Sequence, residues 1–98
     1  MTDMVDQVVG VARLVRHERA LWRRGSHGVI ALGTGAEEPV LITGAGAVVW
    51  DLLESPLSPE ELSRLLGEVH GRASAIVLEE ITPFVEELLN LGVLATCP

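Results

Sequence analysis

The stretch from Val40 to Leu53, VLITGAGAVVWDLL, decides the fold because the spacing of its apolar residues changes from strand-like to helical. Val40–Ile42 is a short apolar run of the kind that forms strands. From Ala45 onward the apolar residues recur at intervals of three and four, which is the period of one buried helix face. Thr43 is the expected N-cap of that helix. The sequence therefore predicts a strand that leads directly into an amphipathic helix.

The residues before this stretch alternate between strand-like runs and turns that contain glycine. Strand character extends over residues 11–23, a turn follows at 24–28, and residues 29–32 form the expected return strand of a hairpin. A second turn over residues 33–39 leads into Val40–Ile42. The sequence thus predicts a small three-stranded antiparallel meander.

Two more helices are predicted downstream. Ser58-Pro59-Glu60-Glu61 combines an N-cap serine, a proline at the first helical position and a glutamate that completes a capping box, and this helix ends at Gly71. A third helix covers residues 75–91. Pro83 lies inside it, at a cost of about 3 kcal/mol in an unbroken helix. We therefore expect a kink near Glu79 to Pro83, or two shorter helices with Thr82 capping the second.

The composition fits one small domain without disulfides. The chain has 98 residues, of which 48% are hydrophobic, and its single cysteine, Cys97, has no internal partner. We expect residues 1–10 to form a flexible arm and residues 11–98 to form a single domain. The chain starts without the basic region of a signal peptide, and no apolar stretch approaches the length of about 18 residues that spans a membrane. A cytoplasmic protein without membrane contact is expected.

The charge is divided unevenly along the chain, whose net charge is −7. Residues 1–28 hold five arginines against three acids, whereas residues 29–98 hold two arginines against eleven acids, and there is no lysine. Acidic proteins repel phosphate backbones, so non-specific binding to nucleic acid is not expected. The arginine cluster from Arg13 to Arg24 is either a solvated strand face or a contact for an acidic partner.

No group of residues typical of an enzyme or a metal site stands out. The three histidines lie far apart without ligand spacing: His17, His27 and His70. The sequence Gly44-Ala45-Gly46 after a strand imitates a dinucleotide-binding fingerprint, but Val49 occupies the position of the third glycine. These glycines fit a tight entry from strand to helix better. We expect no catalytic residues, no metal and no cofactor.

Three strands and three helices of these lengths also fit a winged helix-turn-helix, so a DNA-binding regulator is the alternative from another class. A recognition helix reads base edges through Arg, Lys, Asn or Gln side chains. The third predicted helix has four glutamates, one asparagine and no basic residue. The fold would suit DNA binding, but this surface does not. A purely structural subunit of an enzyme complex is a third interpretation.

As the last strand of the meander, Val40–Ile42 is an expected sheet edge. Natural edges are usually protected by charge or proline, but these three residues are themselves apolar. An open apolar edge suits β-augmentation, in which a peptide adds a strand to the sheet. It would also allow two copies of the chain to pair as a homodimer. The competing interpretation is that helices cover both faces of the strand.

The order of these features resembles the PqqD-like family, named for coenzyme PQQ synthesis protein D. The resemblance runs from about residue 12 to 95. It covers the arginine-rich strand ending in Leu21-Trp22, the return strand, Val40–Ile42, the helix ending VVWDLL, the Ser-Pro-Glu-Glu-Leu helix and the closing pattern of residues 80–94. Two positions depart from the family: Gly44 replaces a common capping asparagine, and Pro83 is atypical.

The resemblance implies a winged helix-turn-helix-like α+β domain, with a three-stranded antiparallel sheet followed by three helices. Such domains act as recognition elements for ribosomally synthesised and post-translationally modified peptides (RiPPs). They bind the leader segment of the precursor and present it to a separate modifying enzyme, such as a radical-SAM protein, a protease or a cyclase. The leader would add as a strand along Val40, Leu41, Ile42 and Thr43. The groove candidates on the third helix are Val77, Ile81, Val85 and Leu88, with Phe84 assigned to the core.

Overall fold

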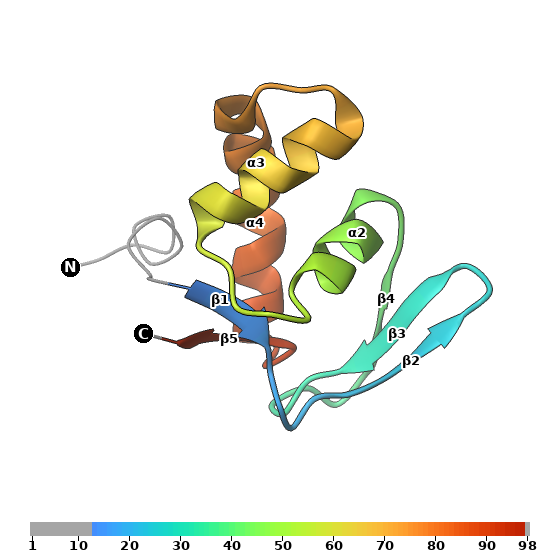
Figure 1. Cartoon of the computed structure of the whole chain (residues 1–98). Helices are drawn as coiled ribbons and strands as arrows, with labels where there is room; N and C mark the ends of the chain where they lie inside the picture. The colour runs from blue at the N-terminus through green and yellow to red at the C-terminus, as the bar shows by residue number, and fades with distance from the viewer. Residues whose placement is uncertain (1–12, 98) are drawn as a thin grey trace.

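The structure is a computed structural model that describes residues 13–97, and within this range it contains two antiparallel sheets and three helices (Figure 1). The larger sheet has the order β2 (Leu21–Gly25), β3 (Gly28–Leu32), β4 (Val40–Ile42). The smaller sheet pairs β1 (Arg13–Arg16) with β5 (Leu94–Cys97). The helices are α2 (Ala45–Leu52), α3 (Pro59–His70) and α4 (Ser74–Asn90). The predicted α+β class, a three-stranded antiparallel sheet followed by three helices, is confirmed.

The first strand differs from the prediction. The sequence predicted one strand over residues 11–23, but within the described residues the chain turns at 17–20 and separates β1 from β2. The Ala20 N–H donates to the His17 carbonyl oxygen at 3.0 Å within this turn. β1 instead pairs with β5 at the far end of the sequence, a partner that local spacing cannot reveal. The arm predicted for residues 1–10 lies outside the described residues.

One hydrophobic core joins both sheets to all three helices. In Figure 1, α4 runs through the centre of the view, with α2 and α3 packed beside it. Nearly every element contributes a fully buried side chain: Leu14 of β1, Val29 of β3, Ile42 of β4, Trp50 of α2, Leu62 of α3, Val85 of α4 and Leu94 of β5. Because such interiors are close-packed, α4 has a fixed position relative to β4.

Arg16 of β1 lies between Trp22 of β2 and Trp50 of α2 and so links the three elements. The Arg16 guanidinium lies 4.9 Å from the ring centroid of Trp22 and 4.8 Å from that of Trp50. The two indole rings pack edge to face, with their centroids 5.3 Å apart. Arg16 Nε also donates to the Trp50 carbonyl oxygen at 2.9 Å. Such cation–π contacts are worth about 0.5 to 2 kcal/mol. This part of the arginine cluster therefore has a structural role.

The helix α3 has the ends that the sequence predicted. The Glu61 N–H donates to Ser58 Oγ and the Ser58 N–H donates to Glu61 Oε1, both at 3.0 Å, so the capping box is complete. The hydrogen bonds from the Ser58 backbone and hydroxyl hold the pKa of the Glu61 carboxyl below its usual value. Gly71 ends the helix in the left-handed conformation, with φ 65°.

The start of α2 is capped differently from the prediction. Gly44, not Thr43, is the N-cap, and it has φ 59° and makes no side-chain capping bond. The Thr43 carbonyl oxygen accepts from the Gly46 N–H at 3.1 Å instead. A positive φ is inexpensive for glycine, so the strand can turn into the helix within two residues. The expected tight entry from strand to helix is therefore present.

The helix α4 continues through Pro83 as a single element, so the prediction of two shorter helices is wrong. Pro83 lies on the exposed side, where water can hydrate the backbone carbonyl that the proline leaves unpaired. Thr82 does not cap a second helix. Its hydroxyl donates to the Leu78 carbonyl oxygen at 2.6 Å, within the same helix.

We expect Ser58→Ala to lower the free energy of unfolding by about 1 kcal/mol, because it removes the acceptor for the Glu61 N–H. Urea denaturation followed by circular dichroism measures this change. The matched control is Ser55→Ala, which alters an exposed serine in the preceding loop and is expected to cost less than about 0.5 kcal/mol. Equal losses in the two variants would contradict a stabilising role of the capping box.

Candidate functional site

Within the described residues, β4 has a strand neighbour on one side only. It pairs with β3 through Val29↔Ile42, Ile30↔Leu41 and Ala31↔Val40, and the sheet ends there. A strand at the end of a sheet keeps one row of backbone donors and acceptors that strand pairing does not use. β4 is therefore the edge strand that the sequence predicted.

The strand register determines which residue of β4 presents its backbone to the open side. The hairpin turn between Gly25 and Gly28 has two residues, so these glycines form a hydrogen-bonded pair. Such pairs alternate along antiparallel strands, which directs the backbone groups of Ile30 toward β2 and away from β4. Leu41 stands opposite Ile30, so its own N–H and C=O point away from β3. Within residues 13–97, the Leu41 N–H and C=O are thus left without a strand partner at the edge.

The side chains of the four predicted edge residues divide between the two faces of the sheet. Ile42 is 2% exposed and belongs to the core, and Val40 is half-buried beside it. Leu41, on the opposite face, is 59% exposed, and Thr43 is exposed where the strand ends. An added strand would lie beside the backbone of these residues, with its own side chains alternating between the same two faces.

The four predicted groove residues of α4 are buried, with exposed fractions between 1% and 8%. They are the core-facing row of the helix: Val77, Ile81, Val85 and Leu88. Val77 and Ile81 also line a surface hollow where α2 begins, α3 ends and α4 begins. Phe84, which the sequence assigned to the core, is half-buried at its margin.

A second row of residues runs along α4 next to the buried one. Its members follow one another at intervals of four, three and four, which keeps them on one side of the helix: Glu80, Phe84, Glu87 and Leu91. This row borders β4 and the start of α2, because Glu87 and Leu91 line a hollow with Val40 and the Phe84 ring lies against Gly46. The four groove residues that the sequence predicted belong to the neighbouring, buried row of the same helix.

Three glutamates surround a hollow of about 450 Å³ where β4 begins. We call it the acidic hollow. It lies between the loop that precedes β4 and the last turns of α4, and it is lined by Ala36, Glu37, Glu38, Pro39, Val40, Glu87 and Leu91. An edge-bound peptide would meet it beside Val40.

A second hollow of about 280 Å³, the helix-end hollow, lies where α2 begins, α3 ends and α4 begins. Its lining is Ala45, Leu66, His70, Arg72, Val77, Glu80 and Ile81. Arg72 donates two hydrogen bonds to the Glu80 carboxylate, at 2.6 and 2.5 Å. These bonds raise the pKa of Arg72 above its usual value. The remaining wall is largely aliphatic, so this hollow suits an apolar side chain.

Gly46, Ile42 and Phe84 meet between the two hollows. A Cβ atom at Gly46 would lie 2.9 Å from Phe84 Cζ and 3.2 Å from Ile42 Cγ2, closer than side chains normally approach. The first turn of α2, the end of β4 and the middle of α4 are therefore in direct contact. We call the line formed by the acidic hollow, Phe84 and the helix-end hollow the β4–α4 groove.

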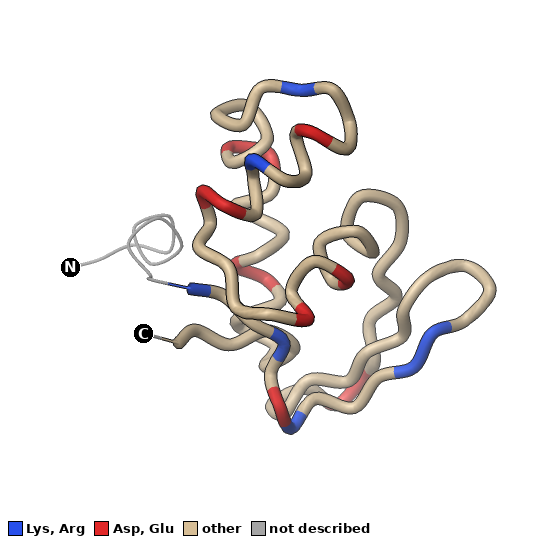
Figure 2. The backbone as a smooth tube through the Cα atoms, viewed as in Figure 1, with Lys and Arg blue, Asp and Glu red and all other residues tan. Residues whose placement is uncertain are grey.

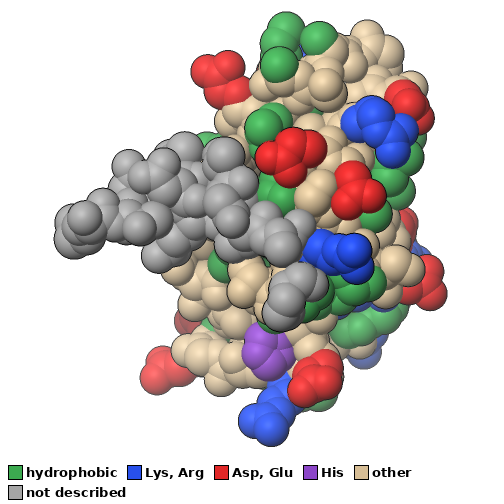
Figure 3. Space-filling view, turned by 60° about the vertical axis from the view of Figure 1, so that its left-hand side comes forward, with side chains coloured by type: hydrophobic (Ala, Val, Ile, Leu, Met, Phe, Trp, Pro, Cys, Tyr) green, Lys and Arg blue, Asp and Glu red, His purple; other side chains and the backbone are tan. Residues whose placement is uncertain are grey.

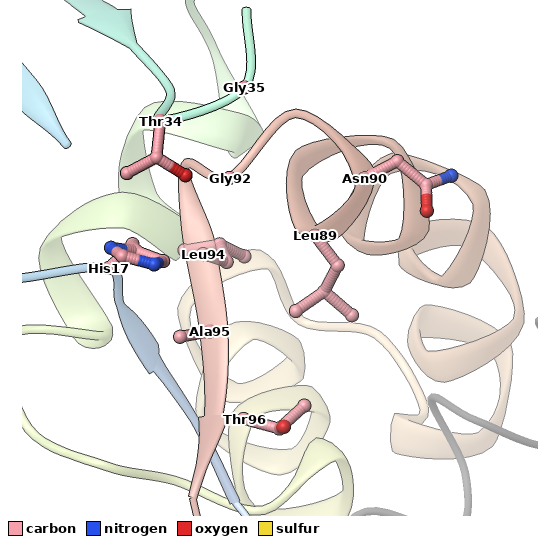
Figure 4. Close-up of a pocket in the computed structure, with 9 residues that line it drawn as sticks. All are labelled: His17, Thr34, Gly35, Leu89, Asn90, Gly92, Leu94, Ala95 and Thr96. Atoms are coloured by element: carbon pink, nitrogen blue, oxygen red, sulfur yellow. The ribbon is translucent and has the colours of Figure 1, made fainter. Parts of the chain in front are cut away.

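A third hollow, of about 440 Å³, lies beside β5 and the end of α4 (Figure 4). The residues around it are His17, Thr34, Gly35, Leu89, Asn90, Gly92, Leu94, Ala95 and Thr96. His17 is the one titratable group among them, and its Nδ1 accepts from the Arg19 N–H at 3.1 Å. The lining of this hollow contains no pair of groups for acid–base chemistry.

The arginine cluster of the sequence is partly used within the fold. Arg24 forms an ion pair with Asp51 of α2, and Arg16 lies 3.9 Å from the same carboxylate. Arg13, Arg19 and Arg23 are exposed. On the face shown in Figure 3, basic side chains lie among acidic ones and do not gather into one basic patch.

The described residues show no arrangement for metal binding and no helix suited to a membrane. No group of three His, Cys, Asp or Glu residues in the range 13–97 could hold a metal ion. None of the helices in this range is both long enough and apolar enough to cross a bilayer. The acidic residues of α4 lie in two pairs along the helix, at residues 79–80 and 86–87 (Figure 2).

We expect Gly46→Ala to destabilise the protein by about 1 kcal/mol, because the new Cβ must displace the Phe84 ring. The same change in a Phe84→Ala background is expected to cost much less, since the ring tip is gone. Denaturation of the four proteins in this cycle measures the coupling between the two positions. Gly35→Ala, where a Cβ meets nothing within 4 Å, is the matched control. If the loss of stability in the double variant equals the sum of the losses in the two single variants, the contact between Gly46 and Phe84 is contradicted.

Comparison with known proteins finds a solved structure with a similar fold. No family model matches the sequence, and no curated protein matches it. The fold is similar to the solution NMR structure of the PqqD truncation of PqqCD from Methylobacterium extorquens, described as a functional and stand-alone RiPP recognition element. The match covers 85% of this chain and 88% of that chain, with a TM-score of 0.68 and 16% sequence identity. The fold that the PqqD-like resemblance implied is thereby confirmed.

Proposed function

We propose, from the fold shared with a PqqD recognition element, that this chain binds the leader segment of a ribosomally synthesised precursor peptide. The leader adds to the sheet as a strand beside β4. The observation that carries the proposal is the N–H and C=O of Leu41, which face away from β3 on an apolar edge strand with one hollow at its start and another at the start of α2. These are the two components of β-augmentation, since backbone bonds give affinity and side-chain pockets give selectivity.

The backbone of β4 and the hollows beside it have different roles in recognition. Hydrogen bonds to Leu41 hold any extended segment, whatever its side chains. Inward-facing side chains of the leader enter the β4–α4 groove, where Phe84 and the hollows at either end of it favour some residues over others. Ordering the leader costs entropy and limits the affinity. We therefore expect a dissociation constant between micromolar and nanomolar, which corresponds to a binding free energy of roughly −8 to −12 kcal/mol.

The bound leader is then presented to a separate modifying enzyme in the cytoplasm, such as a radical-SAM protein, a protease or a cyclase. In this proposal the chain itself performs no chemistry and needs no cofactor or metal. The open edge of β4 would also allow two copies to pair, and a homodimer formed this way would compete with the leader.

Binding to DNA is less well supported by the same surface. In a winged-helix regulator the recognition helix is basic or amidic, whereas α4 carries Glu79, Glu80, Glu86 and Glu87 and no basic residue (Figure 2). Titration with duplex DNA at low and high salt separates the two functions. Tight, salt-sensitive binding of DNA would contradict our proposal.

We expect Leu41→Pro to abolish leader binding, because proline removes the outward N–H and its ring obstructs the approaching strand. Edge strands tolerate proline where the N–H faces outward, so the variant should still fold. The measurement is fluorescence polarisation with the labelled leader of a short precursor peptide encoded beside this gene.

Leu41→Ala is the matched control, since it shortens the same exposed side chain but keeps the backbone donor. We expect its affinity to stay within a few-fold of wild type. Circular dichroism verifies the fold of both variants. A folded Leu41→Pro protein with unchanged affinity would rule out the β4 edge as the binding site.

A further inference from the structure

We infer that the leader bound by this chain carries a lysine or arginine about four residues after an apolar residue. The basic side chain occupies the acidic hollow and the apolar one occupies the helix-end hollow. The inference rests on the proposed function and specifies the peptide class that the β4–α4 groove accepts. It follows from the difference in charge between the two ends of the groove, from their separation and from the direction of β4.

The acidic hollow carries negative charge that the described residues do not neutralise. Glu37, Glu38 and Glu87 all line it, all are at least partly exposed, and none forms a salt bridge with a described residue. The helix-end hollow is different, because its glutamate, Glu80, is already paired with Arg72. One end of the groove therefore favours a cation, whereas the other offers mainly an aliphatic wall.

The distance between the hollows sets the spacing in the peptide. Along α4 the helix-end hollow is lined around Val77–Ile81 and the acidic hollow around Glu87–Leu91, about ten residues later. At about 1.5 Å per helical residue this is about 15 Å. An extended strand covers that distance in about four residues. An even spacing also places both side chains on the same face of the added strand, toward the groove.

The direction of β4 sets their order. β4 runs from the acidic hollow at Val40 toward Ala45 at the helix-end hollow. The existing sheet is antiparallel, and antiparallel pairing is the more stable arrangement, so an added strand runs the opposite way. The apolar residue therefore comes first in the leader, and the basic residue follows.

The test is selection of binding peptides from a random library of short displayed peptides. We expect the wild-type protein to enrich peptides with an apolar residue followed about four positions later by Lys or Arg. A synthetic peptide of the enriched sequence is then titrated against wild type and against the triple variant E37Q/E38Q/E87Q. Each exposed charge contributes a few-fold in affinity, so we expect the triple variant to bind about tenfold more weakly.

The matched control is E54Q/E60Q/E79Q, which removes three exposed carboxylates that line neither hollow. We expect it to bind the peptide like wild type, although its net charge is that of the test variant. If both triple variants lost the same affinity for the peptide, the loss would come from the overall charge of the protein, and the inference would be overturned.

Leu41→Pro separates failure of the inference from failure of the proposed function. Enriched peptides that bind wild type but not Leu41→Pro, and that show no preference for a basic residue, would overturn the inference and leave strand addition intact. Peptides that bind Leu41→Pro as well as wild type would overturn the proposed function itself. Failure of the wild-type protein to enrich any peptide would contradict both.

Discussion

The groove depends on one close contact, between the backbone of Gly46 and the side chains of Phe84 and Ile42. Because Gly46 has no side chain, α2 can start directly beside β4 while α4 packs against both. This contact fixes how far the helix lies from the edge strand. A larger residue at position 46 would displace the Phe84 ring, which separates the two hollows. The spacing that we expect to select peptides is thus a consequence of packing in the core.

A division between the two sides of β4 explains how one short strand can serve both stability and binding. Alternation directs the backbone of Val40 and Ile42 toward β3, where it holds the sheet together, and directs that of Leu41 outward. The side chain of Ile42 is buried in the core, so the strand remains in place without a partner on its open side. The edge is therefore preformed, and binding of a strand costs the protein little conformational entropy.

The sequence predicts the elements whose signals are local, and it fails where the partner is distant or where a helix must be oriented. The capping box at Ser58, the glycine stop at Gly71 and the β2–β3–β4 meander follow from nearby residues. The pairing of β1 with β5 does not, because no local pattern identifies strands at opposite ends of the chain. For α4 the apolar row is wide, and its spacing alone cannot separate the buried Val85 from the half-buried Phe84. The place of β4 at the sheet edge was therefore predictable, whereas the division of the α4 residues between core and surface was not.

Binding of the peptide to the backbone of Leu41 is tested residue by residue by amide hydrogen exchange. In the free protein the N–H groups of Val40 and Ile42 are bonded to β3 and should exchange slowly, whereas that of Leu41 should exchange fast. We expect the bound leader to slow exchange at Leu41 markedly and to leave exchange at its two neighbours nearly unchanged. Fast exchange at Leu41 in the saturated complex would contradict it.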